Sequence, residues 1–533
     1  MSFLPKIIKY ILATAMFTPL IVGSNFIFPY IAPKIFVFEL IVELALILWI
    51  YLILKKPEYR PSKNVLTISL SVFFLILIIT SFLGANVYRS FFMDYERMDG
   101  VFHLLHFFVF FLIASSVFRK KEDWLELFSL SVVISPIVAL VSQGSHGSNR
   151  LSGSLGNPDF IACYATFNLA FAVFLIYSAY QKFIQKIEPI RSNIYLITGI
   201  IGLISAPLMI WFSATRGAIL ALIAVIGLNI LILPWVKQSG KYLLSNKIRK
   251  TLVILTVLGI FLIGGLYLSR NNPSINRNLT ISRLTHISFH SGTVHNRLLV
   301  WKYGWEGFKE RPIRGWGWEN FLVPFNKHYT NKLNEPWFDK SHNEYLDILI
   351  SSGILGLLAY LSIFVSAFYL LKKYYSLNPK QNFWIAWIFA SLLLFYLLQN
   401  IPLFDTPAIY LMIFTIFSFI AWLSPQNQTK ISQKNIHTLN FNYFGWITYS
   451  LVVIIIITIS YQWVIKPAYA SQQAINGFKF YQFASKAKDE NSSNLSLKES
   501  QRYLDHALSL NTYGNPEIIK ILSSYLNNLN QIK

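Results

Sequence analysis

Long apolar runs constrain the fold of this chain more than any other feature of its sequence. A helix needs about 20 apolar residues to cross the hydrocarbon core of a bilayer. We find thirteen runs near that length, at positions 7–27, 35–54, 65–85, 101–118, 125–141, 160–180, 194–212, 218–236, 252–268, 345–371, 383–398, 408–423 and 446–464. With 54% apolar and 13% charged residues, the chain has too little polar surface to cover a soluble globule of 533 residues. The sequence therefore predicts an all-α polytopic membrane protein with about 13 transmembrane helices.

The basic residues predict the orientation of the protein in the membrane. With the N-terminus inside, the segments on that side hold 22 Lys and Arg residues, whereas the five short outer connections hold 5. Because short cytoplasmic loops are rich in Lys and Arg, we expect a cytoplasmic N-terminus and, after an odd number of spans, an extracytoplasmic C-terminus. The net charge of +22 is explained by this topology, so no nucleic acid partner is expected. The first run lacks a small-residue cleavage site, which favours a retained span over a removed signal.

Two long polar segments divide the chain into four predicted regions. An N-terminal membrane domain with nine spans covers 1–269, and a large extracytoplasmic loop domain covers 270–342. A second membrane domain with four spans covers 343–464, and an extracytoplasmic tail covers 465–533. Both soluble regions are therefore expected on the same side of the membrane.

The tail is expected to be helical. Its residue pattern predicts helices over 468–483 and 497–510, separated by a polar break over 488–494. One or two helical hairpins of this kind resemble the repeats of TPR solenoids. A small packed cap is the plainer interpretation, because solenoids need several stacked copies.

The loop domain is basic and contains a predicted amphipathic helix. It holds eleven Lys and Arg residues against five Asp and Glu residues, which favours an anionic partner, with a merely solvated basic loop as the alternative. Apolar spacing over 294–310 predicts a helix lying on the membrane surface. Arg297 falls in the middle of its apolar arc, where the guanidinium group needs an anion such as a diphosphate or, alternatively, extends to lipid phosphates.

His342 opens the tenth apolar run and is a candidate general base. Ser341 and Glu344 have the spacing of a capping box, so we expect Ser341 to be the N-cap and His342 to lie in the first helical turn. The positive helix end disfavours imidazolium, which keeps the ring neutral and able to accept a proton. A purely structural histidine is the alternative.

Arg216 lies in a tight outer turn between the seventh and eighth runs. Nothing obliges so short an outward connection to contain a cation. The adjacent Gly217 allows close backbone approach, so this turn is a candidate site for a small anion. Anchoring to lipid headgroups is the alternative.

The acidic residues give only a weak indication of a metal site. Asp94 and Glu96 form a D-x-E pair in the second outer loop, but such pairs occur by chance, so neither a metal nor a cofactor is predicted. The single Cys163 excludes an intramolecular disulfide and a Cys-based metal site. Glu39 and Glu43, one turn apart in the second run, are expected to pair with an outer arginine or, alternatively, to relay protons.

Several motifs resemble those of the O-antigen ligase and polymerase superfamily. Three consecutive elements are similar to its signature: an Arg-started, Trp-containing helix from Arg297, a P-x-x-G-x-G turn over 312–317, and an H-N pair at His342 that opens a helix with G-x-x-G. The supporting matches are R-M-D-G (97–100), G-N-P (156–158) and A-T-R-G-A (214–218). Their combination in this order spans most of the membrane region.

The resemblance implies a bacterial plasma-membrane glycosyltransferase with a GT-C-like fold. Its donor would be a polyprenyl-diphosphate-linked glycan, its acceptor a lipid, a glycan or a protein, and its catalysis independent of metal. Arg216 and Arg297 match the arginines that bind the diphosphate, and His342 matches the histidine that serves the acceptor in an inverting displacement. The substrate-binding residues that we predict beside them are Arg97, Asn157, Arg314, Trp316, Trp318 and Asn343. The two tryptophans are expected either to stack on sugar rings or to lie in an interfacial aromatic belt.

The nature of the acceptor has more than one interpretation. The thirteenth run and the exported tail differ from the arrangement typical of lipopolysaccharide ligases and are more similar to O-linked protein oligosaccharyltransferases. A glycan polymerase, whose acceptor is another lipid-linked glycan, shares the motifs and is the first alternative. A transporter of anionic lipid-linked glycan is the second, although the notable cations lie at the outer rim rather than at mid-membrane.

Overall fold

The structure is a computed structural model that describes residues 3–141, 149–238, 240–288, 292–330, 333, 338–424, 443–487 and 489–532. Its regular structure is helical apart from one short antiparallel pair, β1 (Lys237–Gln238) and β2 (Lys241–Tyr242). The chain forms two compact units, and each joins segments that are far apart in sequence. The first unit consists of Met1–Pro61, Asn86–Val117 and Lys434–Lys533, and the second of Ser62–Ala85 and Phe118–Gln433.

Within the described residues, ten helices are long and apolar enough to cross a membrane, and two shorter apolar helices accompany them. These correspond to the last twelve of the thirteen predicted runs. The first run differs, because α1 (Leu4–Thr14) gives way to a 3-10 helix over Ala15–Leu20 that contains Pro19. Proline lacks an N–H group and disfavours an unbroken helix. The prediction of an all-α polytopic membrane protein is confirmed, and the count of thirteen spans stays a prediction.

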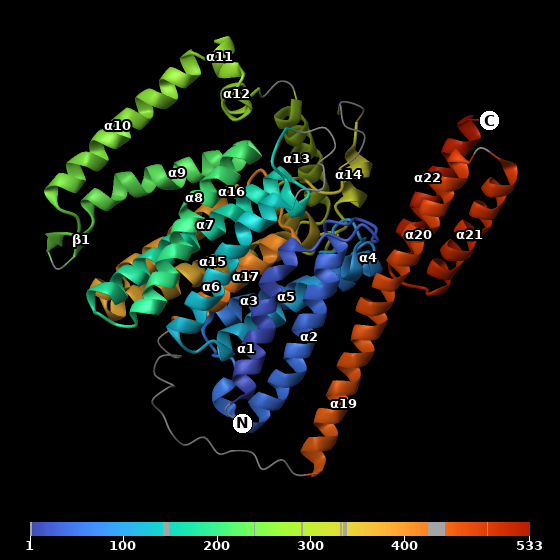
Figure 1. Ribbon diagram of the computed structural model, residues 1–533, viewed down its shortest axis with the longest axis horizontal. Helices are drawn as coiled ribbons and strands as arrows, with labels where there is room; N and C mark the ends of the chain where they lie inside the picture. Colours follow the sequence, from blue (N-terminus) through green and yellow to red (C-terminus); the bar gives the residue numbers. More distant parts are fainter. Residues whose placement is uncertain are drawn as a thin grey trace. The chain divides into compact units, whose positions relative to one another are not determined.

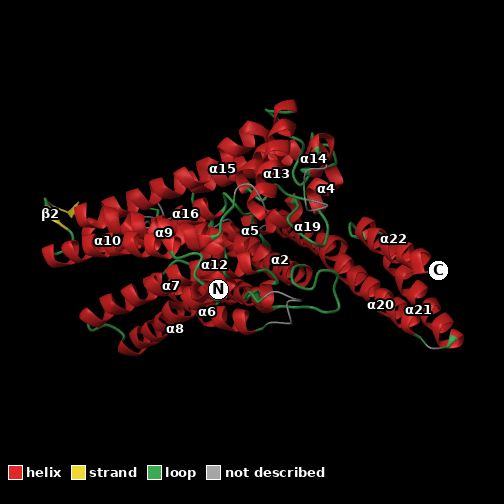
Figure 2. Cartoon of the chain, turned by 90° about the horizontal axis from the view of Figure 1, so that it is seen from above, coloured by secondary structure: helices red, strands yellow, loops and turns green. Residues whose placement is uncertain are grey.

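The first unit joins N-terminal helices to the tail. It contains α1, α2 (Ala32–Lys55), α4 (Val87–Phe92), α5 (Val101–Val117), α19 (Tyr443–Ser460), α20 (Lys466–Lys486), α21 (Glu490–Ser509) and α22 (Asn515–Ile532). A π-helical turn over Tyr461–Ile465 connects α19 to α20, so the last predicted span continues directly into the tail. Because α21 begins at Glu490, the predicted break is wrong over 490–494, and Lys488 lies outside the described residues. Figure 2 shows α20, α21 and α22 as neighbouring helices; their likeness to TPR repeats stays a prediction.

The two acids of α2 bond to histidines, so the expected pairing with an arginine is wrong. Glu39 lies 2.5 Å from Nδ1 of His103, and Glu43 lies 3.2 Å from Nε2 of His106. Ser460 of α19 donates a hydrogen bond to the other oxygen of Glu43. The two histidines project from α5 toward α2, and this packing was not visible in the sequence. A charged side chain at the centre of a membrane helix costs about 2.5–3.5 kcal/mol, which such bonds offset.

The tail contacts the second outer loop inside the first unit. Tyr513, in the turn before α22, stacks on Phe92 with ring centroids 5.3 Å apart. Gly514 lies so close to the Tyr95 ring that a Cβ atom would be 2.1 Å from it. The N–H group of Tyr95 donates a hydrogen bond to the Glu517 carboxyl group at 2.7 Å. The loop with the D-x-E pair and the last helix therefore share an interface.

Glu517→Gln is expected to remove a pH dependence from this interface. Burial, followed by the nearby Asp94, raises the pKa of Glu517 from 4.5 to about 8. Glu96 adds to the shift, whereas the hydrogen bond from the Tyr95 N–H and the charge of Lys520 oppose it. A carboxyl group with a raised pKa contributes its full share of folding stability below pH 4.5. This stability is lost as the pH rises through about 8. The measurement is amide hydrogen exchange of α22 in the full chain, corrected for the intrinsic pH dependence of exchange. In the wild type, the corrected rate should increase between about pH 6 and about pH 9, whereas in Glu517→Gln it should not change. Equal protection of wild-type α22 at both pH values would contradict this interpretation.

The second unit is a helical bundle that contains most of the predicted site residues. Its long helices are α3 (Val65–Phe82), α6 (Lys121–Leu140), α7 (Pro158–Ile184), α8 (Pro189–Ser213), α9 (Arg216–Ile232), α10 (Asn246–Leu268), α15 (Glu344–Leu377), α16 (Pro379–Gln399) and α17 (Pro407–Trp422). The loop region adds α11 (Pro273–Asn276), α12 (Leu279–Thr285), α13 (Gly292–Glu310) and α14 (Leu322–His328). Figure 2 shows α7 lying between α8 and α16, and α9 also packs on α16. Figure 1 shows β1 at the turn between α9 and α10. Lys332 and Glu335 of the basic loop lie outside the described residues.

The helix predicted over 294–310 is confirmed as α13, but its packed face is different from the predicted apolar arc. Val300 and Gly304 are buried, whereas Leu298 and Trp305 are 42% and 49% exposed. Gly304 explains the difference, because Ile350 of α15 approaches to a distance at which a Cβ atom would be only 2.7 Å away. α13 therefore packs against α14 and α15 within the protein.

Candidate active site

Two arginines lie at the turn between α8 and α9. The turn is tight because Ala214 adopts a left-handed φ of +49°, and α9 begins two residues later at Arg216. Arg150 is fixed to the same turn: its Nη2 atom lies 2.7 Å from the Asp159 carboxylate, and its Nε donates to the Ser213 carbonyl at 2.8 Å. The Nε atom of Arg216 is buried and has no hydrogen-bond partner in the described part of the chain.

Arg283, from α12, is a third arginine at this turn. Its Nε atom donates to the Ala214 carbonyl at 3.0 Å. Burial, followed by the charges of Arg150 and Arg216, lowers the pKa of Arg283, and Asp159 opposes the shift. Three guanidinium groups around one carboxylate leave two positive charges, an arrangement that favours an anionic ligand. We call Arg150, Arg216 and Arg283 the arginine cluster.

His342 lies in the loop before α15, so its predicted position in the first helical turn is wrong. The N-cap is Asn343, whose side chain accepts a hydrogen bond from the Leu346 N–H at 3.1 Å. Ser341, the predicted cap, instead donates its N–H to the Asp347 carboxylate at 2.8 Å. His342 itself adopts a φ of +57°, which is uncommon for a residue with a side chain and sets it apart from the helix.

The imidazole of His342 lies between two phenylalanine rings. It makes edge contacts with Phe338 and Phe404, at centroid distances of 5.6 and 5.1 Å. Its Nδ1 atom is 3.3 Å from the Lys340 carbonyl oxygen. A carbonyl oxygen only accepts hydrogen bonds, so this contact places the proton of the neutral ring on Nδ1.

α13 connects Arg297 to the loop of His342. The indole Nε1 of Trp301 donates to the Ser341 carbonyl at 3.0 Å, which fastens α13 to the residue before His342. Arg297 precedes Trp301 by one helical turn on the same side of α13 and is half-buried. The structure therefore brings the third predicted catalytic residue to the same part of the second unit.

The loop over 399–406, which runs from the last residue of α16 to the N-cap of α17, contacts both the arginine cluster and the histidine. Its Phe404 packs on the His342 ring, as described, and also on the first turn of α7. Its Pro402 lies against Gly217, where a Cβ atom would be 3.1 Å from Cγ of the proline. Because Gly217 follows Arg216 directly, this loop joins the two predicted sites into one region.

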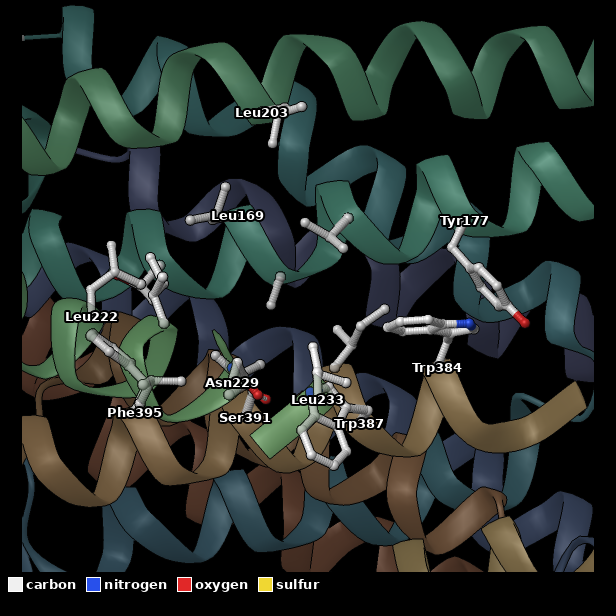
Figure 3. Close-up of a pocket in the computed structure, with 17 residues that line it drawn as sticks. Leu169, Tyr177, Leu203, Leu222, Asn229, Leu233, Trp384, Trp387, Ser391 and Phe395 are labelled. Atoms are coloured by element: carbon white, nitrogen blue, oxygen red, sulfur yellow. Dashed lines mark hydrogen bonds between the residues drawn. The ribbon is translucent and has the colours of Figure 1, made fainter. Parts of the chain in front are cut away.

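Two cavities border this region. A groove of about 470 Å³ lies between α13 and the start of α15, and Trp301, Lys302 and Asn343 are among its lining residues. A second groove, of about 510 Å³, lies among α7, α8, α9 and α16. Figure 3 shows its mostly apolar lining, in which Ser391 donates a hydrogen bond to Asn229 at 3.1 Å.

The remaining predicted substrate-binding residues have varied surroundings. Arg97 belongs to the first unit, where it pairs with Glu96 at 3.5 Å. Asn157 is the N-cap of α7 and accepts a hydrogen bond from the Asp159 N–H at 2.8 Å. Arg314 is exposed in the turn after α13. Each keeps its substrate-binding role as a prediction.

Trp316 and Trp318 are buried, at 7% and 3% exposure, so neither ring offers an open face to a sugar or to lipid headgroups. Their turn packs on α15 through glycines: a Cβ atom on Gly315 would be 2.3 Å from the Ser351 carbonyl oxygen, and one on Gly353 would be 2.1 Å from that of Ile313. Both glycines have positive φ. Gly315 of the P-x-x-G-x-G turn and Gly353 of the G-x-x-G motif therefore allow the turn to pack closely on α15.

Three parts of this region are absent from the predicted set: Arg150, Arg283 and the loop over 399–406. Arg150 shares with Arg216 a position in a short outer connection, which was an available signal. Arg283 has no such signal, because it is one of eleven basic residues in its loop. No motif in the sequence links the loop over 399–406 to His342, and the packing of Phe404 on the histidine ring reveals its place.

Comparison with known proteins agrees with the motifs. Residues 198–361, which include Arg216, Arg297 and His342, match the O-antigen ligase family. A general O-oligosaccharyltransferase of Acinetobacter baylyi is 22% identical over 274 residues, which are 48% of this chain and 44% of that relative. The chain thus matches less than half of the relative's length. The family match over residues 198–361 and this relative, together with the membrane helices, support the similarity of the chain to the O-antigen ligase superfamily.

Proposed function

We propose that the protein transfers an oligosaccharide or polysaccharide from a polyprenyl-diphosphate carrier to an acceptor at the extracytoplasmic face of the bacterial plasma membrane. The observation that carries this proposal is the meeting of the arginine cluster and His342 at the loop over 399–406. A diphosphate requires cations and an acceptor hydroxyl group requires a base, and this region supplies both. The distribution of Lys and Arg supports a cytoplasmic N-terminus and an extracytoplasmic tail.

In this mechanism the protein supplies a base and positive charge to a single displacement. Nε2 of His342 takes the proton from the acceptor hydroxyl group as its oxygen attacks the anomeric carbon. The bond from that carbon to the diphosphate oxygen breaks on the opposite side, which inverts the anomeric centre. Arg216 and Arg297 stabilise the negative charge that develops on the departing polyprenyl diphosphate. These cations do the work that a divalent metal does in other transferases, so no metal is required.

The apolar groove of Figure 3 is suited to the isoprenoid chain of the carrier. α9 connects the two sites, because it begins at Arg216 and lines the groove with Leu222, Val225 and Ile226. At 1.5 Å per residue, Leu222 lies about 9 Å along the helix from Arg216. An isoprenoid chain is attached directly to its diphosphate, so an apolar groove that starts this close to a cation matches the chemistry of the donor.

Ile226→Trp is expected to weaken binding of long-chain polyprenyl diphosphates. Ile226 lines the groove and is 47% exposed, so an indole ring at this position occupies the groove without overpacking the core. Loss of several buried methylene groups predicts an affinity about 10-fold lower for a long-chain diphosphate and unchanged for a short-chain one. Leu228→Trp, on the same helix and 41% exposed but outside the groove, is the matched control. Equal affinities of both variants for the long chain would contradict the assignment.

The transfer reaction itself tests the proposed function. Full-length protein in nanodiscs is supplied with a defined polyprenyl-diphosphate-linked glycan and, separately, with a protein, a lipid or a second lipid-linked glycan as acceptor. Mass spectrometry should find the glycan on one acceptor and free polyprenyl diphosphate beside it, with and without EDTA. Growth of the glycan on its lipid carrier would identify a polymerase instead. A glycan that stays on its carrier with every acceptor would argue against any transferase activity.

A further inference from the structure

The short helix α12 is fixed to the end of α8 by two side-chain hydrogen bonds. Thr280, which is 4% exposed, donates to the Trp211 carbonyl at 2.8 Å, and Nε of Arg283 donates to the Ala214 carbonyl at 3.0 Å. The Trp211 carbonyl also accepts the Ala214 N–H at 3.1 Å, and because a carbonyl oxygen has two lone pairs, it can accept the Thr280 hydroxyl group as well. The end of α8 therefore positions the Arg283 guanidinium group through one nitrogen.

The two terminal nitrogens of Arg283 remain available after this contact. Within the described residues they have no hydrogen-bond acceptor and no carboxylate within 4 Å. Arg150 is different, because it bonds to Asp159, to the Ser213 carbonyl and to the Thr215 hydroxyl group. A guanidinium group has five N–H donors and no acceptor, so a ligand of the terminal nitrogens of Arg283 must accept hydrogen bonds. Because the guanidinium group is positively charged, an anion is favoured.

The charges of the cluster indicate which anion. Asp159 offsets Arg150, with which it forms an ion pair at 2.7 Å. Arg216 and Arg283 keep their charges and lie close enough to repel each other. A diphosphate diester has one negative charge on each phosphate, so its two charges equal the excess. A ligand with two phosphate groups can present one to each of these arginines.

We propose that Arg283 is a further donor-binding residue, which holds one phosphate of the lipid-linked diphosphate while Arg216 holds the other. The proposal rests on the proposed function and extends it, because it assigns to α12 of the loop domain a part of the donor site. Thr280 is a positioning residue, since it acts through the placement of α12. The pair of arginines explains how the site distinguishes a diphosphate carrier from a monophosphate carrier of the same chain length.

Binding of two lipid probes tests this assignment in the full-length protein in nanodiscs. The probes are a long-chain polyprenyl diphosphate and the corresponding monophosphate. Arg283→Gln should weaken diphosphate binding about 10- to 100-fold, the effect of losing a charge-assisted hydrogen bond, and monophosphate binding by no more than about threefold. Arg283→Lys should recover part of the diphosphate affinity, because it keeps the charge. Arg277→Gln, an exposed residue before the same helix, is the matched control and should bind both probes as the wild type does.

The two affinities separate a ligand contact from a structural role. A variant that merely loosens α12 weakens both probes by the same factor, and this result would overturn the proposal, as would unchanged affinities. Unfolding temperatures of Arg283→Gln and the control should agree. If the wild type itself fails to bind the diphosphate probe, the proposed function is wrong. The donor-binding role of Arg283 is then excluded as well.

Discussion

His342→Ala is expected to lower the rate of glycan transfer about 10²- to 10⁴-fold, the range typical of a general base. Donor affinity should stay near that of the wild type, because the arginine cluster and not the imidazole binds the diphosphate. Phe338 and Phe404 hold the ring, and the contact of Nδ1 with the Lys340 carbonyl oxygen sets the tautomer in which we expect Nε2 to accept the proton. Single-turnover rates with bound donor, measured beside donor affinity, check both parts of this expectation.

The control for this variant is His328→Ala, which removes a histidine of α14 that pairs with Glu310 of α13 and leaves the region of the loop over 399–406 intact. Its turnover should match that of the wild type. The acidic limb of the pH–rate profile, which reports the base, should be present in this control and absent from His342→Ala. If His342→Ala instead lost donor binding and kept its rate with bound donor, the histidine would be a diphosphate ligand and the base would lie elsewhere.

Arg297→Lys is expected to lower turnover about 10- to 100-fold although it conserves the charge. A lysine ammonium is a point charge and does not reproduce the two parallel hydrogen bonds that a guanidinium group makes to a diphosphate. The half-buried position of Arg297, one turn before the anchored Trp301, sets the side chain in a defined place where this geometry matters. Single-turnover assays with saturating donor measure the effect.

Lys309→Arg provides the reverse exchange on the same helix. Lys309 is exposed and pairs with Glu306 at 2.5 Å, so either cation serves there and the rate should not change. If Arg297→Lys were as active as this control, the position would need only a positive charge, and bidentate binding of the diphosphate by Arg297 would be excluded.

The sequence by itself determined the class of this protein and the identity of its main candidate residues. Apolar runs of membrane-spanning length are a local property, and twelve of the thirteen correspond to helices. The spacing over 294–310 is also local, and it predicted α13 within two residues. Motif order singled out Arg216, Arg297 and His342, and all three lie within residues 198–361, which match the O-antigen ligase family.

The tertiary structure decided what depends on contacts between distant segments. The N-cap of α15 is Asn343 rather than Ser341, because Asp347 holds the Ser341 N–H outside the helix. Histidines of α5 satisfy the acids of α2. Arg283 joins Arg216 because the end of α8 offers it a carbonyl group 69 residues away in sequence. Periodicity reports which face of a helix is apolar, but it does not report which partner covers that face, and hydrogen bonds and ion pairs across the bundle follow from the partner.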